Sequence, residues 1–174
     1  MRATLIALML IFRSQAGADV SNVWKVVSPS VVSVLPTWPG YTKPDAGAPA
    51  GAAPKGTEIA ISKDGRILTA AHVIARATEI VVGDSSNNFA SAHTVFMSSE
   101  TDLAILKVDV ETFAIVLVNE VPEIGIATCL INNSFGLDLG ITCGVVSATG
   151  RKNIGFSRIE GFIRTDAVSN PGSS

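Results

Sequence analysis

Residues 56–74 read GTEIAISKDGRILTAAHVI, and this stretch decides the fold class. A β-rich run over residues 58–61 leads into Lys63-Asp64-Gly65, a sequence typical of a hairpin turn. Residues 66–69 form a second β-rich run, which passes through two small residues to His72. The stretch therefore predicts a β-hairpin whose second strand leads to a histidine and a short helical turn.

Strand signals of the same kind recur along the chain, about 8–15 residues apart. We expect further strands over residues 31–35, 78–82, 92–97, 103–108, 114–118, 127–131, 141–148 and 162–165. Residues 20–25 carry a few helical turns at most. Closely spaced strands with hardly any helical periodicity predict an all-β barrel or sandwich.

The composition sets limits on the class of protein. The chain has 174 residues, a formal net charge of −2, 47% hydrophobic residues and 16% charged residues. This is enough apolar material for one core and too little charge for a disordered chain. The slightly acidic balance gives no electrostatic reason to bind nucleic acid. The sequence has no apolar run of about 18 residues, which excludes a multi-span integral membrane protein.

The first eighteen residues have the order of a cleavable secretory signal peptide. Met1-Arg2 is a positive start, residues 3–12 are continuously apolar, and Ala16-Gly17-Ala18 offers a cleavage site. We expect residues 1–18 to be removed and residues 19–174 to be exported. The alternatives are a buried helix or a membrane anchor, but so short a run cannot cross about 30 Å of hydrocarbon.

Two further segments bear on the organisation of the exported part. Residues 36–55 hold five of the eight prolines and are otherwise mostly Ala, Gly and Thr. We interpret them as a long mobile loop within one domain, because the strand before them is too short to be a domain itself. Cys129 and Cys143 are too few for a disulfide framework and lack the spacing of a zinc site. In an oxidising compartment they either pair or stay as two buried thiols, and both alternatives remain open.

Only two histidines, His72 and His93, are available as a general base. His72 follows a strand, and Asp102 comes directly before the apolar run at residues 103–108. A carboxylate there needs a partner, and a histidine Nδ1–H group is a suitable one. The alternatives are a packed histidine at a strand end and an aspartate in an exposed turn. His93 belongs to no motif and is expected on the surface.

The last residues, TDAVSNPGSS at 165–174, contain a Pro-Gly turn followed by serine. Such a turn can aim backbone N–H groups into one concavity and form an oxyanion hole, although a polar loop is the alternative. Together with the upstream residues, the chain presents a histidine, an aspartate and a serine in the order of chymotrypsin-type proteases.

Five ordered motifs carry a resemblance to the trypsin-like peptidase domain of the HtrA/DegP serine proteases. They are VVSPSVV at 26–32, ISKDGRILTAAHVI at 61–74, TDLAILK at 101–107, FGL at 135–137 with GVVSA at 144–148, and GFIRTDA at 161–167 with NPGSS at 170–174. The resemblance covers residues 20–174. It implies a chymotrypsin-like double β-barrel, with the first barrel nearly complete and the second incomplete.

The resemblance also implies roles for individual residues. Ser174 aligns with the nucleophile, His72 with the general base and Asp102 with the residue that orients it. Gly172 and Ser174 would supply the N–H groups of the oxyanion hole. Ser169 lies where the family has a specificity-pocket residue, and a serine there implies a roomier pocket that prefers medium or large apolar P1 residues. No cofactor and no metal are implied.

The family further implies unfolded or misfolded polypeptides as substrates, a periplasmic location and a possible homotrimer. Family members continue with Ser-Gly-Gly-Pro after the nucleophile, whereas this chain ends at Ser174. We therefore expect a C-terminally truncated peptidase domain that is inactive by itself. Glu58 is a second departure, because the family has Gly-Ser-Gly at residues 56–58. The alternative functions are a non-catalytic, protease-like binding protein and an unrelated secreted β-domain.

Overall fold

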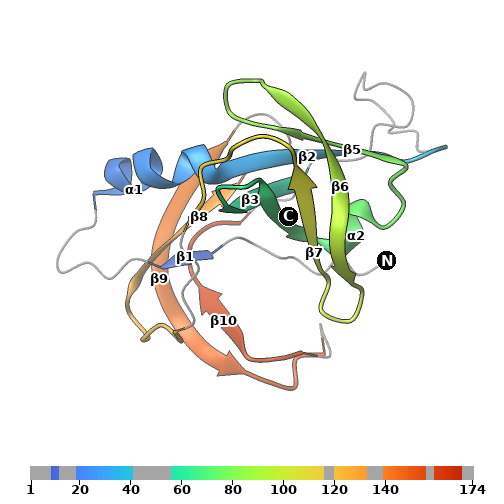
Figure 1. The fold of residues 1–174 in the computed structure, drawn as a ribbon. Coiled ribbons are helices and arrows are strands. Elements are labelled where there is room, and N and C mark those ends of the chain that lie inside the picture. The colour runs from blue at the N-terminus through green and yellow to red at the C-terminus, as the bar shows by residue number, and fades with distance from the viewer. Residues whose placement is uncertain are drawn as a thin grey trace.

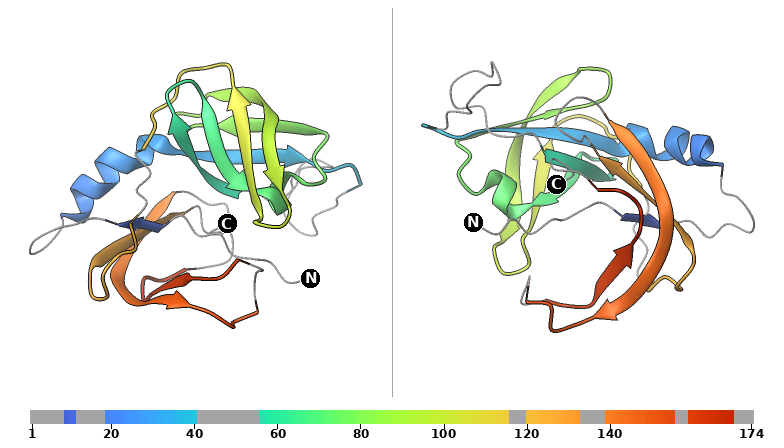
Figure 2. Two further views of the ribbon diagram at one scale, coloured as in Figure 1. Left: turned by 60° about the horizontal axis from the view of Figure 1, so that its bottom comes forward. Right: turned by 180° about the vertical axis from the view of Figure 1, so that it is seen from behind.

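The computed structural model describes residues 9–11, 19–40, 56–115, 120–132, 139–155 and 159–169. They form two β-sheets, one closed into a barrel and one open (Figure 1). The left view in Figure 2 separates the two, with the barrel above the open sheet. The all-β prediction is confirmed.

The barrel is the larger unit, and all its neighbouring strands are antiparallel. Its six strands are β2 (Val31–Thr37), β3 (Gly56–Ser62), β4 (Arg66–Ala70), β5 (Glu79–Gly83), β6 (Phe89–Ser98) and β7 (Leu103–Val108). They follow the order β2-β3-β4-β7-β6-β5, and the pairing of β5 with β2 closes the barrel. Because alternate residues of a strand point inward, the core contains Val34, Ala60, Ile67, Ala104 and Leu106, all fully buried.

The hairpin between β3 and β4 turns where the sequence predicts it. Gly65 has φ +89°, a left-handed conformation that favours glycine, and its N–H group donates to the Ser62 carbonyl oxygen over 3.2 Å. A Cβ atom at Gly65 would collide with the Val108 carbonyl oxygen. The Val108 N–H group in turn donates to the Gly65 carbonyl oxygen over 2.9 Å, so the turn also holds the end of β7.

The open sheet has the order β1-β8-β9-β10. Its strands are β1 (Met9–Ile11), β8 (Ala127–Asn132), β9 (Gly140–Arg151) and β10 (Phe162–Thr165). Helix α1 (Val20–Val27) leads through a 3₁₀ turn, η1 (Ser28–Ser30), into β2. Val23 and Val27 of α1 pack with Val31 of β2 and with Cys129 and Ile131 of β8, which joins the barrel to the open sheet.

Three segments differ from the expected boundaries. Ala114 and Ile115 are not in a strand, and residues 116–118 lie outside the described residues. Ile115 packs against the core between the barrel and the open sheet, which accounts for an apolar residue at this position. Strand β2 runs through Pro36 to Thr37, so the expected loop begins later, and its residues 41–55 are not described. Strand β1 lies within the stretch expected to be a signal peptide.

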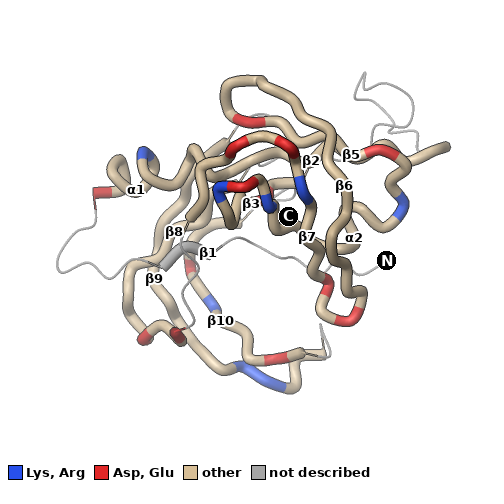
Figure 3. Tube along the Cα trace, viewed as in Figure 1, with Lys and Arg blue, Asp and Glu red and all other residues tan. Residues whose placement is uncertain are grey.

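The described surface carries charges of both signs. Figure 3 shows acidic and basic residues interspersed along the chain, many of them at turns and strand ends. Two exposed ion pairs follow this pattern, Arg66 with Asp64 at 3.7 Å and Lys107 with Asp109 at 3.4 Å. Among the described helices, none combines the length and the apolar character that crossing a membrane requires.

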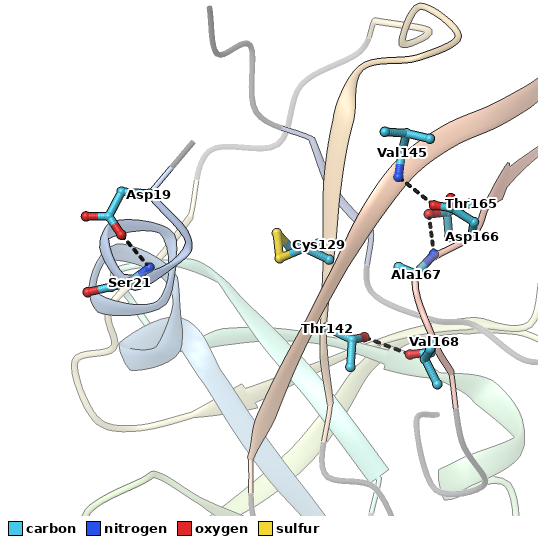
Figure 4. Close-up of a disulfide and its surroundings, with 10 residues drawn as sticks. Asp19, Ser21, Cys129, Thr142, Val145, Thr165, Asp166, Ala167 and Val168 are labelled. Atoms are coloured by element: carbon cyan, nitrogen blue, oxygen red, sulfur yellow. Dashed lines mark hydrogen bonds between the residues drawn. A yellow bond between two sulfur atoms is a disulfide. The ribbon is translucent and has the colours of Figure 1, made fainter. Parts of the chain in front are cut away.

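Cys129 and Cys143 form a disulfide, which decides between the two alternatives left open by the sequence (Figure 4). The two residues are direct partners in the antiparallel ladder between β8 and β9, and their Cα atoms are 4.1 Å apart. Cys129 is buried in the core beneath α1, whereas Cys143 is exposed. The bond therefore fixes the register of the β8–β9 pair.

We predict that reduction of this disulfide lowers the free energy of unfolding by about 3 kcal/mol, because a cross-link closing roughly fifteen residues restricts the unfolded chain by that amount. Urea denaturation with and without a thiol reductant measures the change. A Cys129→Ser, Cys143→Ser double variant is the control and should not respond to the reductant. Equal stability of the reduced and oxidised wild-type protein would contradict the prediction.

Candidate active site

His72 lies where the barrel strand β4 gives way to a one-turn helix, α2 (Ala71–Ile74). Ala71, Val73 and Ile74 are buried against the barrel core, whereas the His72 side chain is 40% exposed. The small residues before the histidine allow close packing of the backbone, and the Ala71 N–H group donates to the Asp102 carbonyl oxygen over 3.0 Å. This local structure presents the imidazole at the end of the barrel.

Asp102 meets His72 through both of its carboxylate oxygens. Oδ1 accepts a hydrogen bond from the His72 backbone N–H group over 2.9 Å, and Oδ2 lies 2.7 Å from His72 Nδ1. Asp102 has φ +56°, in the left-handed region that aspartate tolerates better than most residues. Its side chain is 19% exposed, so the carboxylate is largely shielded from water. The structure thus brings together two predicted site residues that are thirty positions apart in sequence.

This geometry determines which nitrogen of His72 is available for chemistry. In the neutral ring, a proton on Nδ1 donates to Asp102 Oδ2, and the lone pair is then on Nε2. A carboxylate held in this position also stabilises the ring when it becomes positively charged. The pair therefore has the geometry of a general base and the residue that orients it.

The chain approaches its last residues along the edge of β9. Asp166 Oδ1 accepts a hydrogen bond from the Val145 N–H group over 2.6 Å, and Thr142 Oγ1 donates to the Val168 carbonyl oxygen over 2.7 Å (Figure 4). A Cβ atom at Gly144 would collide with Asp166 Oδ1 and lie 2.6 Å from the Ala167 nitrogen. Two side-chain hydrogen bonds thus hold residues 165–168 against β9.

The remaining predicted site residues are at the end of the chain. Ser169 follows the segment at residues 165–168 and is exposed. Residues 170–174, which include Gly172 and Ser174, lie outside the described residues. The roles expected for Ser169, Gly172 and Ser174 therefore stay predictions.

Two acidic residues that the sequence reasoning did not place in the site shape its surroundings. Asp166 was visible only as part of a motif, and its contact with β9 depends on the fold. Glu58 is buried inside the barrel, where its oxygens accept hydrogen bonds from the Val34 N–H group over 3.2 Å and from Thr69 Oγ1 over 3.0 Å. Burial raises the pKa of Glu58 to about 8, although these two hydrogen bonds lower it. The sequence indicated Glu58 only because the resembling family has a glycine at this position.

Comparison with known proteins identifies the family. The trypsin-like peptidase domain matches residues 56–174. The chain belongs to this family. The chain is 36% identical over 122 residues to a probable periplasmic serine endoprotease, DegP-like, of Chlamydia trachomatis, covering 69% of the chain and 24% of that protein. It is 35% identical over 122 residues to the serine endoprotease DegS of Haemophilus influenzae, covering 68% of the chain and 36% of that protein.

Solved structures agree with the fold. The HtrA-type protease AlgW with a tripeptide superposes with a TM-score of 0.77 at 32% identity, covering 90% of this chain and 48% of the AlgW chain. A serine endoprotease from Yersinia pestis gives a TM-score of 0.71 at 30% identity, covering 92% of this chain and 53% of the solved chain. The predicted chymotrypsin-like fold of the HtrA type, with a closed first barrel and a partial second one, is confirmed. The chain spans about a quarter of the length of the DegP-like relative and about half of these solved chains.

We predict that Asp166→Ala frees the segment at residues 165–168. The Val145 amide loses a hydrogen bond to a charged acceptor, worth about 1.5–3 kcal/mol, so its hydrogen exchange should accelerate by about tenfold or more. Amide exchange followed by NMR measures this. Asp109→Ala is the matched control, because the Asp109 side chain is 91% exposed. Equal exchange at Val145 in the two variants would show that Asp166 does not hold the segment.

Proposed function

We propose that the protein carrying this peptidase domain hydrolyses peptide bonds with a triad of His72, Asp102 and Ser174. The observation that supports the proposal most directly is the 2.7 Å contact between His72 Nδ1 and Asp102 Oδ2 at the end of the closed barrel. In this mechanism Ser174 Oγ attacks the scissile carbonyl carbon, and His72 Nε2 takes its proton and returns it to the leaving amine. Asp102 holds the tautomer and stabilises the imidazolium.

The backbone N–H groups of Gly172 and Ser174 are the proposed oxyanion hole. Ser169 is the proposed pocket residue and would favour medium or large apolar P1 residues. Unfolded or misfolded exported polypeptides are the proposed substrates, and a homotrimer is the proposed assembly. Relatives named serine endoproteases support the reaction class, as does a related structure that carries a tripeptide. The reaction uses protein groups and water.

We also propose that residues 1–18 direct export to the periplasm, since several relatives are named periplasmic. Cleavage after Ala18 would remove β1 and leave β8 as the edge strand of its sheet. Because a signal peptidase needs small residues at its recognition positions, Ala16→Asp and Ala18→Asp should each block processing. N-terminal sequencing of the periplasmic protein should begin at Asp19, and a mature protein that retains Met1 would contradict the proposal.

The triad makes a prediction about a reactive-serine probe. A fluorophosphonate should label Ser174 in the complete protein carrying this sequence, and Ser174→Ala should abolish labelling. Asp102→Asn should reduce the labelling rate by about 10³–10⁴-fold at neutral pH, because the asparagine side chain favours the wrong histidine tautomer. Intact-protein mass spectrometry follows the adduct.

His93→Ala is the matched control, since His93 is exposed on β6 outside the site, and it should label like the wild type. Cleavage products of the active protein report the P1 preference, and dominance of small or charged residues would contradict the role of Ser169. A folded protein that is neither labelled nor active would favour the non-catalytic binding function instead.

A further inference from the structure

Glu58 is an unusual residue for the interior of a small β-barrel. Only 4% of the Glu58 surface is exposed to solvent, and a buried carboxyl group is costly unless it makes specific contacts. Glu58 belongs to β3 and reaches both neighbouring strands, accepting from the Val34 N–H group of β2 and from Thr69 Oγ1 of β4. One side chain therefore connects three consecutive strands of the barrel from within.

The backbone of β3 leaves a defined space for this side chain. A Cβ atom at Gly56 would collide with Glu58 Oε1, so the carboxyl group folds back over a position that has no side chain. Thr57 between them is also buried. The Glu58 side chain thus occupies a place shaped by the neighbouring glycine.

The contact with Thr69 connects Glu58 to the active-site pair. Thr69 is three residues before His72 and pairs with Ala104 of β7, two residues after Asp102. The next pair of the ladder joins Ala70 to Leu103. The strand end that Glu58 holds is therefore the one that brings His72 and Asp102 together.

We propose that Glu58 is a positioning residue, whose side chain connects the end of β4 that precedes His72 to β2 from inside the barrel. The proposal rests on the proposed function, because it gives the His72–Asp102 pair its catalytic meaning. Glu58 acts through Thr69 and the β4 backbone and takes no part in the bond-making steps.

The protonation state of Glu58 gives this arrangement a pH dependence. Burial raises the pKa of Glu58 to about 8, so the neutral form dominates at pH 7 and a buried negative charge develops above pH 8. The elements packed on β3 contribute few charges: β2 and η1 carry none, and β4 carries Arg66, which is exposed beside Asp64. Elsewhere in the barrel the strands carry Glu79 on β5, His93 on β6 and Lys107 on β7, and α2 carries His72.

The sign of the effect follows from linkage. A folded-state pKa above the unfolded value means that stability from Glu58 is fully present below about pH 4.5 and is lost as pH rises through about 8. Because a charged carboxylate is costly inside the barrel, the same ionisation should draw water toward Glu58 and alter the surroundings of His72. A non-ionisable glutamine of similar shape should remove both effects.

The test compares wild type with Glu58→Gln in the complete protein carrying this sequence, with Glu79→Gln as the matched control for an exposed carboxyl group of the same barrel. NMR of the His72 ring from pH 6 to 10 is the first readout and does not depend on turnover. We expect an inflection near pH 8 in the wild type and in Glu79→Gln, and none in Glu58→Gln. The His93 ring, on β6, should show no such inflection in any of the three proteins.

The second readout is the pH profile of kcat/KM. If the ionised form is unproductive, activity should fall about tenfold between pH 7 and 9 in the wild type and less than about twofold in Glu58→Gln, since one pH unit above the pKa leaves about a tenth of the neutral form. The two proteins should have similar activity at pH 7. Absence of turnover in both would contradict the proposed function, while the NMR titration would still decide the role of Glu58.

An identical dependence of the His72 ring signals on pH in wild type and Glu58→Gln would overturn the proposal. So would a variant that changes only the pH dependence of unfolding, because Glu58 would then have a structural role alone. If Glu58→Gln does not fold, Thr69→Val serves instead. It removes the contact through which Glu58 acts and a hydrogen bond that lowers the pKa of Glu58, so the His72 inflection should weaken and move to higher pH, and an unchanged inflection would overturn the proposal.

Discussion

The pairing of β4 with β7 is the constraint on which the site depends. The ladder joins Ala70 to Leu103, so the residues just beyond these strand ends, His72 and Asp102, meet at one end of the barrel. A slip of one residue would turn every side chain of a strand to the opposite face and separate the pair. Closure of the barrel through β2 and β5 restricts such a slip, because each strand is held on both edges.

The two sheets contribute different parts of the arrangement. The barrel supplies the histidine and the aspartate, whereas the open sheet holds the segment at residues 165–168 through Asp166 and Thr142. The core that α1 shares with β2 and β8 keeps these parts in a fixed relation. A perturbation of this core would thus act on the site without touching any reacting group.

Much of the fold follows from local sequence patterns. The β-branched and alternating apolar residues predicted the strands, and Lys63-Asp64-Gly65 predicted the turn that Gly65 makes with φ +89°. His72 and Asp102 were found because few side chains can serve as a base and its partner, and the structure brings them into contact. Residues 170–174 lie outside the described part of the chain, and the catalytic roles of His72, Asp102 and Ser174 stay predictions.

The features that the sequence did not predict depend on neighbours distant along the chain. The apolar run at residues 3–12 indicated a signal peptide, and the pairing of residues 9–11 with β8 as β1 depends on a sheet formed far downstream. Ile115 resembled a strand residue because packing against a core shared by two sheets also selects apolar residues. The burial of Glu58 depends on its hydrogen bond with Thr69 and on the space over Gly56, and both follow from the fold rather than from local sequence.

The Cys129–Cys143 bond has a consequence for how the second sheet assembles. The two cysteines are direct ladder partners, so they meet only when β8 and β9 are aligned in one way. A one-residue slip would carry Cys143 to the opposite face, and a two-residue slip would displace it along the strand by about 6–7 Å. Oxidation therefore stabilises the correctly aligned pair of strands, whereas misaligned pairs form no disulfide and can dissociate and pair again. The disulfide thus selects one strand alignment as the sheet folds.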